Sequence, residues 1–233
     1  MSESASTSSF LARTMRRRSF FQAAGATVAA STLLLAGCGD DTTVEPALPP
    51  TTLSLGKGEI GVANYAYLLE QLEAAFYQKV LDSPPSDFLA GELASFTELR
   101  DHEVIHREFF KQLLGTSAIP TLEFNFSSIT FTTRAGVLAA ARTFEDLGVA
   151  AYNGAGKLLS TKATLVLVGK IASVEARHAA FIRDLLQADP FADAVETTGA
   201  FAGLGRTLTP AQVIEAAAKF FPYTILVSDL PTA

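Results

Sequence analysis

The sequence has little sulfur and, over most of its length, little basic charge, and both shortages exclude classes of function. Its 233 residues include one Cys, two Met, three His and no Trp. Because Cys38 is the sole cysteine, no intrachain disulfide can form. Residues 39–233 hold 14 of the 18 Lys and Arg but 23 of the 24 Asp and Glu, a net charge of −9. Nucleic-acid binding requires clustered basic residues, so this acidic body excludes it.

The few basic residues near the N-terminus belong to what resembles an export signal over residues 1–38. Arg17–Phe21 is similar to the twin-arginine export motif. An apolar run then ends in Leu35–Cys38, which resembles a bacterial lipobox whose cysteine is lipidated. We therefore expect a protein of the cell envelope, at the periplasmic face, anchored to the membrane through lipid on Cys38. The alternative is a single-pass anchor followed by an inert cysteine. We expect residues 39–58, which contain three prolines, to form a flexible tether.

Four long apolar-periodic segments predict an all-α fold over residues 59–187. We expect helices at about 59–81, 87–114, 133–159 and 162–187, with Ser86 or Asp87 capping the second. Residues 115–132 predict a crossover, because an extended segment of that length spans roughly 60 Å. A helix over 87–114 is only about 42 Å long. The expected architecture is an antiparallel four-helix bundle with one long crossover. Residues 188–233 form a C-terminal extension with a short helix from Thr209, which Phe220 and Phe221 would dock onto the bundle.

Two four-residue motifs, Glu103–His106 and Glu175–His178, lie in the second and fourth of these segments. Residues three apart are neighbours on one face of a helix, so each motif presents a carboxylate beside an imidazole. Around them, residues at alternating spacings of three and four form the stripe that a bundle helix buries. These stripes are Phe96, Leu99, Glu103, His106, Phe110, Leu113 and Val168, Ile171, Glu175, His178, Ile182, Leu185.

The two halves of the bundle also repeat one another. Glu70 and Tyr77 are seven residues apart, as are Glu145 and Tyr152, and each pair precedes a helix with the Glu-x-x-His motif. One such motif is weak evidence for a site, but two with partner glutamates in matching positions are strong evidence. The repeat predicts four carboxylates and two imidazoles pointing into one core.

Four buried carboxylates without basic partners would be costly, because each unpaired one destabilises the fold by several kcal/mol. They could instead be protonated, or the stripes could be rotated toward solvent, although Phe110 and Ile182 would then be exposed too. Two divalent cations would balance four carboxylates, and mixed oxygen and nitrogen ligands suit iron or manganese. We therefore expect two Fe or Mn ions, without distinguishing between the metals.

The stretches Leu68–Tyr77, Glu145–Tyr152 and Val174–Ala180 resemble the ferritin-like di-iron or di-manganese carboxylate proteins. The branch they are similar to is the exported bacterial one related to desiccation proteins. This resemblance implies a ferritin-like bundle and a ligand from each of six positions. It implies that Glu103 and Glu175 bridge the metals and that Glu70 and Glu145 are terminal ligands. The implied metal ligands are Glu70, Glu103, His106, Glu145, Glu175 and His178.

Other polar residues near the stripes have less certain roles. Tyr77 and Tyr152 either hydrogen-bond ligands of opposite helices or simply fill the core. Glu73 is either an extra ligand or an acid just outside the ligand set, and Gly148 in the other half would leave room for a small oxidant. We expect the remaining three, His102, Arg142 and Arg177, to lie on the surface.

The resemblance implies a redox function, and the composition is compatible with one. No Cys-x-x-C pair is present, so the electron-transfer module of rubrerythrins is absent. We expect no catalytic residue beyond the metal ligands, with small oxidants as reactants. The leading hypothesis is Fe(II) oxidation or peroxide removal in oxidative stress, as a ferroxidase or peroxidase. The alternatives are a non-catalytic metal-binding or structural stress protein of the desiccation type and a manganese catalase-like enzyme. A homodimer is compatible with each.

Overall fold

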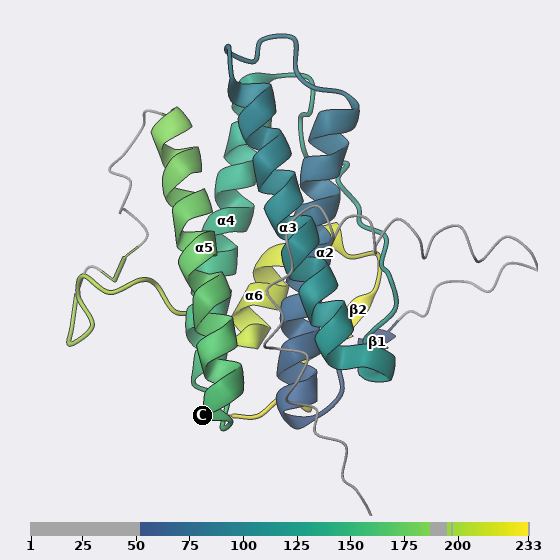
Figure 1. Ribbon diagram of the computed structural model, residues 1–233, viewed down its shortest axis with the longest axis vertical. Helices are drawn as coiled ribbons and strands as arrows, with labels where there is room; N and C mark the ends of the chain where they lie inside the picture. Colours follow the sequence, from purple (N-terminus) through teal and green to yellow (C-terminus); the bar gives the residue numbers. More distant parts are fainter. Residues whose placement is uncertain (1–51, 187–194, 197, 233) are drawn as a thin grey trace, which may run out of the picture. The chain divides into compact units, whose positions relative to one another are not determined.

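The computed structural model describes residues 52–186, 195–196 and 198–232, and four long helices dominate them. These are α2 (Gly58–Asp82), α3 (Glu92–Leu114), α4 (Arg134–Gly156) and α5 (Lys162–Leu186). Helix α2 packs along α3 and α4 packs along α5, while α2 and α4 also contact each other (Figure 1). The predicted all-α bundle of two helical hairpins is therefore confirmed.

Helix α2 is the most deeply buried of the four. Every residue from Asn64 to Ala74 is buried, as expected for a helix that neighbouring elements cover on several sides. The buried amides on α2 hold the crossover against it. Asn64 donates to the carbonyl of Ser117 at 2.9 Å, and Gln71 donates to that of Pro120 at 3.3 Å. These bonds explain how residues 115–132 can run along the bundle with little regular structure of their own, since side chains satisfy their backbone groups.

Helix α3 begins five residues later than predicted. Neither Ser86 nor Asp87 caps it, because the residue before its first turn is Gly91, with φ of 91°. Asp87 instead accepts a hydrogen bond of 2.8 Å from the backbone N–H of Arg134, at the first turn of α4. The predicted helix start is therefore wrong, and Asp87, one of the two expected capping residues, bonds the backbone of α4 instead.

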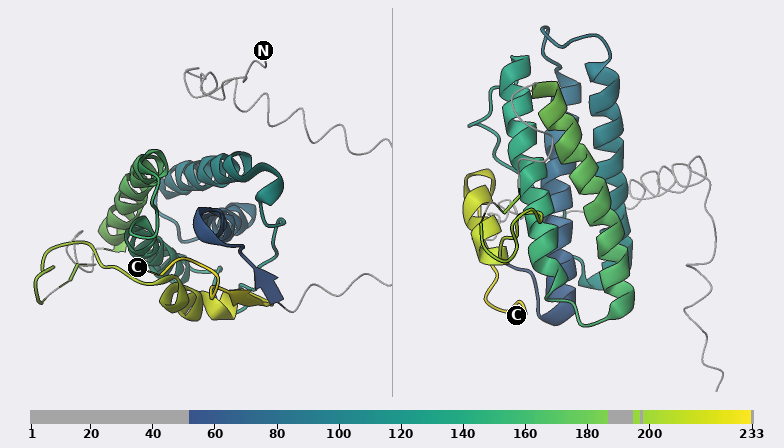
Figure 2. Two further views of the ribbon diagram at one scale, coloured as in Figure 1. Left: turned by 90° about the horizontal axis from the view of Figure 1, so that it is seen from below. Right: turned by 90° about the vertical axis from the view of Figure 1, so that its left-hand side faces the viewer.

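Two short strands join the ends of the described chain. Strand β1 (Thr52–Ser54) pairs in parallel with β2 (Thr224–Leu226), with Leu53 opposite Ile225. Residues 52–54 are thus part of the fold, although the tether was expected to extend to residue 58. Helix α6 (Pro210–Ala217) has the predicted capping box between Thr209 and Gln212. It lies on one side of the bundle against α4 (Figure 2).

The predicted buried stripes are nearly all correct. In α3, Phe96, Leu99 and Phe110 are buried, but Leu113 is 49% exposed and Leu114 is buried in its place. The stripe therefore ends on a spacing of four where three was predicted. Phe220 and Phe221 are buried as expected, and the Phe220 ring lies 4.8 Å from that of Phe144 on α4.

The predicted export signal over residues 1–38, including Cys38, lies outside the described residues. Within the described part of the chain, no helix has both the length and the apolar character needed to cross a membrane.

Candidate metal centre

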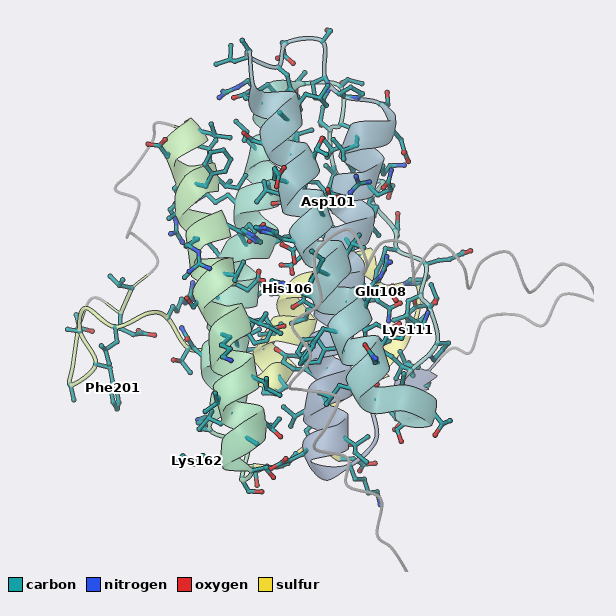
Figure 3. All side chains as sticks on the ribbon, in the orientation of Figure 1. Asp101, His106, Glu108, Lys111, Lys162 and Phe201 are labelled. Carbon is teal, nitrogen blue, oxygen red and sulfur yellow. The ribbon has the colours of Figure 1, made fainter. Side chains whose placement is uncertain are left out.

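The six residues expected as metal ligands come together from all four long helices. Helices α2 and α4 each contribute one glutamate, and α3 and α5 each contribute a glutamate and a histidine. All four glutamates are completely buried, and the histidines are 8% and 5% exposed. In Figure 3, His106 lies about half way along the bundle, beside α3 and toward α5. The residues are Glu70, Glu103, His106, Glu145, Glu175 and His178.

Their donor atoms form two overlapping groups, each within 4.8 Å. One group consists of Glu70, Glu103, His106 and Glu175, and the other of Glu103, Glu145, Glu175 and His178. Glu103 and Glu175 belong to both groups, so they are placed where bridging ligands would be. Glu70 and Glu145 each belong to one group, at the places where terminal ligands would be.

Both histidines turn the same ring nitrogen, Nδ1, toward the carboxylates. Nδ1 of His106 lies 2.9 Å from Oε1 of Glu175, and Nδ1 of His178 lies 2.8 Å from Oε1 of Glu103. Despite these short distances, neither Nδ1 has hydrogen-bond geometry to any partner, and both oxygens of Glu103 and of Glu175 are buried without a hydrogen bond. The atoms converge on common points without hydrogen-bond geometry between them, an arrangement that could hold metal ions.

Two tyrosines hold the terminal glutamates. The hydroxyl of Tyr77 donates to Oε1 of Glu145 at 2.5 Å, and that of Tyr152 donates to Oε1 of Glu70. In each glutamate the other oxygen, Oε2, is buried without a hydrogen bond. Of the two alternatives for the tyrosines, the structure shows hydrogen bonding across the bundle. Burial, followed by the charge of Glu145, raises the pKa of Tyr77, and burial followed by Glu70 does so for Tyr152, so both remain donors.

The electrostatics of the cluster favour protons or cations. Burial raises the pKa of Glu103 well above its ordinary value, and the neighbouring Glu175 raises it further. Burial also raises the pKa of Glu145 and of Glu175. For His106 burial acts to lower the pKa, but the surrounding carboxylates outweigh it and raise the pKa. Without a cation, the cluster therefore holds protons that its residues would not carry in water.

Glu73 is a fifth buried carboxylate, next to the cluster but outside both groups. A Cβ atom built on Gly148 would lie 2.9 Å from Oε1 of Glu73. The space beside Gly148, which the sequence suggested would admit a small oxidant, therefore holds the Glu73 carboxylate. The hydroxyl of Tyr65 is also buried without a hydrogen bond, and burial followed by the charge of Glu73 raises its pKa.

His102 has a contact that was not predicted from the sequence. It is exposed, as expected, but its Nδ1 lies 2.9 Å from Nε2 of His178. Of the two arginines placed on the surface, Arg177 bonds Ser173 within α5, and Arg142 lies 3.6 Å from Asp146. The sequence carries no clear signal for the His102 contact, because it depends on the distance between α3 and α5.

The four-helix bundle and its two Glu-x-x-His motifs place this chain in the class of helical-bundle proteins with a carboxylate-rich core. Residues 58–188 match the model of the ferritin-like domain family. This match covers more than half of the chain, so the protein belongs to that family. A comparison with curated proteins finds no match. The buried cluster fits the family, since its donors are those that could hold metal ions.

Proposed function

We propose that this protein binds two Fe or Mn ions in the cluster and uses them to oxidise Fe(II), with dioxygen or peroxide accepting the electrons, or to remove peroxide. The observation that carries the proposal is the set of buried donor atoms without hydrogen bonds, which falls into two groups sharing Glu103 and Glu175. Buried polar atoms are nearly always hydrogen-bonded in folded proteins. A concentration of exceptions at one place therefore points to an ion.

Charge and ligand type both support this occupant. Four carboxylates carry four negative charges, which two divalent cations would neutralise without buried protons. The donors are carboxylate oxygens and imidazole nitrogens, which suit Fe and Mn, and the part of the chain that the structure describes contains no cysteine or methionine sulfur for Cu(I). The two glutamates common to both groups would each contact two ions, while Glu70 with His106 and Glu145 with His178 would complete one ion's set each.

The protein's residues supply position and exclusion of water. When bound, Fe or Mn would supply one-electron redox chemistry. Tyr77 and Tyr152 fix one oxygen of each terminal carboxylate and so orient the other oxygen toward the cluster. Large apolar rings are buried in the same core, which keeps bulk water out of it: Phe76, Phe96, Phe110 and Phe144.

The sequence of residues 1–38 supports a location for this activity. A twin-arginine motif and a lipobox in succession favour an exported protein anchored by lipid on Cys38 to a membrane of the cell envelope. We include in the proposal a role in oxidative stress, because iron and peroxide produce oxidants together. Residues 39–233 contain neither Met nor Trp, and side chains of these types are among those that oxidants damage.

One observation favours a second candidate, a metal-binding or structural stress protein without turnover. Glu73 fills the space beside Gly148 that a small oxidant would otherwise enter. A manganese catalase-like enzyme would also need access for peroxide. The distinction therefore depends on measured turnover.

The test uses the full-length chain, stripped of metal and then reloaded anaerobically with Fe(II) or Mn(II). Elemental analysis should give two tightly bound ions per chain. Dioxygen or peroxide is then added, and Fe(II) oxidation, followed by absorbance, and peroxide consumption distinguish the candidates. Fewer than one bound ion would refute the metal centre. Two ions without turnover would favour the second candidate, and rapid peroxide dismutation with Mn alone would favour the catalase-like enzyme.

A further inference from the structure

Of the two cluster histidines, His178 contacts a histidine at the surface, His102. Nδ1 of His102 lies 2.9 Å from Nε2 of His178, and the two ring planes are within 20° of each other. The other nitrogen of His178, Nδ1, faces the carboxylate of Glu103. His178 thus lies between the buried cluster and an exposed imidazole.

At a distance of 2.9 Å between Nδ1 of His102 and Nε2 of His178, one proton lies between the two nitrogens. A neutral imidazole has a proton on one nitrogen and a lone pair on the other. To bind an ion through Nδ1, His178 must carry its proton on Nε2. That N–H then donates to Nδ1 of His102, which must itself present a lone pair, so the His102 proton is on Nε2. The opposite arrangement would place a proton on Nδ1 of His178, where the ion would bind.

The other half of the bundle has no equivalent of this pair. The residue before Glu103 is His102, whereas the residue before Glu175 is Val174, which has no hydrogen-bonding side chain. Within the described residues, no side chain hydrogen-bonds Nε2 of His106. The internal repeat supplies both groups with the same kinds of ligand but gives a hydrogen-bonding partner to one of the two histidines.

We infer that His102 is a positioning residue for the group formed by Glu103, Glu145, Glu175 and His178. By accepting a hydrogen bond from Nε2–H, it holds the His178 ring in the tautomer and orientation that leave Nδ1 available to the ion. This makes the two metal positions unequal, with the one at His178 held more firmly than the one at His106. The inference rests on the proposed metal centre. Partners of this kind orient ligand histidines, and losing one typically lowers metal affinity about 10- to 100-fold.

The test uses Zn(II) as a probe, because it is diamagnetic and has no redox chemistry. The full-length chain is labelled with ¹⁵N in its three histidines and loaded with Zn(II). Long-range proton–nitrogen spectra then report the tautomer of each ring. In the wild type we expect His178 to show a metal-bound Nδ1 and a proton on Nε2 that exchanges slowly with water. In His102→Ala we expect that proton to exchange faster and one of the two Zn(II) affinities to fall about 10- to 100-fold.

Two further variants separate positioning from a general structural effect. In His102→Asn the amide oxygen lies close to where the imidazole Nδ1 was, so this variant should recover most of the lost affinity. Val174→Ala removes side-chain volume at the matching place in α5 and should change neither the affinities nor the His178 spectrum. Unchanged affinities and an unchanged Nε2 proton in His102→Ala would overturn the inference and leave the metal centre intact. A wild type that binds no Zn(II), Fe(II) or Mn(II) would overturn both.

Discussion

Helix α3 buries two glutamates, eleven residues apart, in opposite environments. Glu92 accepts hydrogen bonds from the Arg134 guanidinium at 2.6 and 2.8 Å and from the backbone N–H of Leu89 at 2.7 Å. Glu103 has no hydrogen bond to either oxygen. The Arg134 hydrogen bonds lower the pKa of Glu92, whereas burial raises the pKa of Glu103. Burial is common to both, so burial alone does not mark a functional site.

The difference lies in where the counter-charge comes from. Glu92 takes its partner from α4, so the ion pair is complete within the chain and fixes one end of the bundle. Glu103 is surrounded by other carboxylates and by imidazole nitrogens, and the chain gives neither of its oxygens a hydrogen bond. A buried carboxylate whose oxygens have no hydrogen bond within the chain is better evidence for an external ion than burial of a carboxylate alone.

The largest effect is expected from Glu103→Gln. Because Glu103 belongs to both groups of donors, we expect this single change to abolish tight binding of both ions. An ion at 1,000 times its dissociation constant stabilises a protein by about 4 kcal/mol, and the variant should lose this stabilisation. Thermal unfolding with and without Zn(II) measures it. Glu98→Gln, at an exposed position of the same helix, is the matched control. Retention of two ions by Glu103→Gln would contradict its bridging position.

The converse change, Glu92→Ala, should destabilise the fold without affecting the metal centre. It removes hydrogen bonds between charged groups and leaves Arg134 with fewer partners. We expect a loss of about 1–3 kcal/mol in the free energy of unfolding, measured by urea titration of the metal-free chain. The number of bound ions should stay at two. A fall in metal content equal to that of Glu103→Gln would erase the distinction between the two glutamates.

The two environments also predict opposite responses to pH. A carboxyl group whose pKa is raised on folding stabilises the fold below its unfolded pKa, and this contribution is lost as pH rises through the folded pKa. Burial raises the pKa of Glu103, Glu145 and Glu175, so the metal-free cluster should lose stability as pH rises above their ordinary values, near 4.5. For Glu92, with its lowered pKa, the contribution is instead lost as pH falls.

Metal binding should reverse the response of the cluster, because ions bind the deprotonated ligands and release protons. The increase in melting temperature caused by Zn(II) should therefore grow from pH 5 to pH 7.5 in the wild type. This Zn(II)-dependent increase in melting temperature should be absent at every pH in Glu103→Gln. An increase that is constant over this range would argue against protons on the metal-free cluster.

The sequence predicted which residues meet in the buried cluster, because periodicity and repetition both constrain their positions. The alternating spacings around Glu103 and Glu175 fixed which faces of α3 and α5 point inward. The repeat of Glu70 with Tyr77 as Glu145 with Tyr152 supplied the other partners. These are local patterns, and a helix converts them into positions with little ambiguity.

Contacts between distant segments were not predictable in the same way. Asp87 bonds the backbone of α4 and does not cap α3, and the pairing of Leu53 with Ile225 joins segments at opposite ends of the fold. The bond between His102 and His178 depends on how far α3 lies from α5. No local pattern records such distances, so these features required the structure.

The smallest effect is expected from Gly148→Ala. This variant tests whether the carboxylate of Glu73, which like Glu103 has a buried oxygen without a hydrogen bond, is held in place beside the cluster. Alanine normally stabilises a helix relative to glycine by about 0.5–1 kcal/mol. At Gly169 of α5 no atom lies within 4 Å of the new Cβ, so Gly169→Ala should show that gain in full. At Gly148 the new Cβ meets Oε1 of Glu73 at 2.9 Å, and the carboxylate must move. We expect the gain to be cancelled there, with little net change in the free energy of unfolding.

Combining Gly148→Ala with Glu73→Ala removes the opposing atom, so the gain should return when measured against Glu73→Ala alone. If Gly148→Ala stabilises the protein as much as Gly169→Ala, then Glu73 moves without cost, and its carboxylate is not fixed beside the cluster.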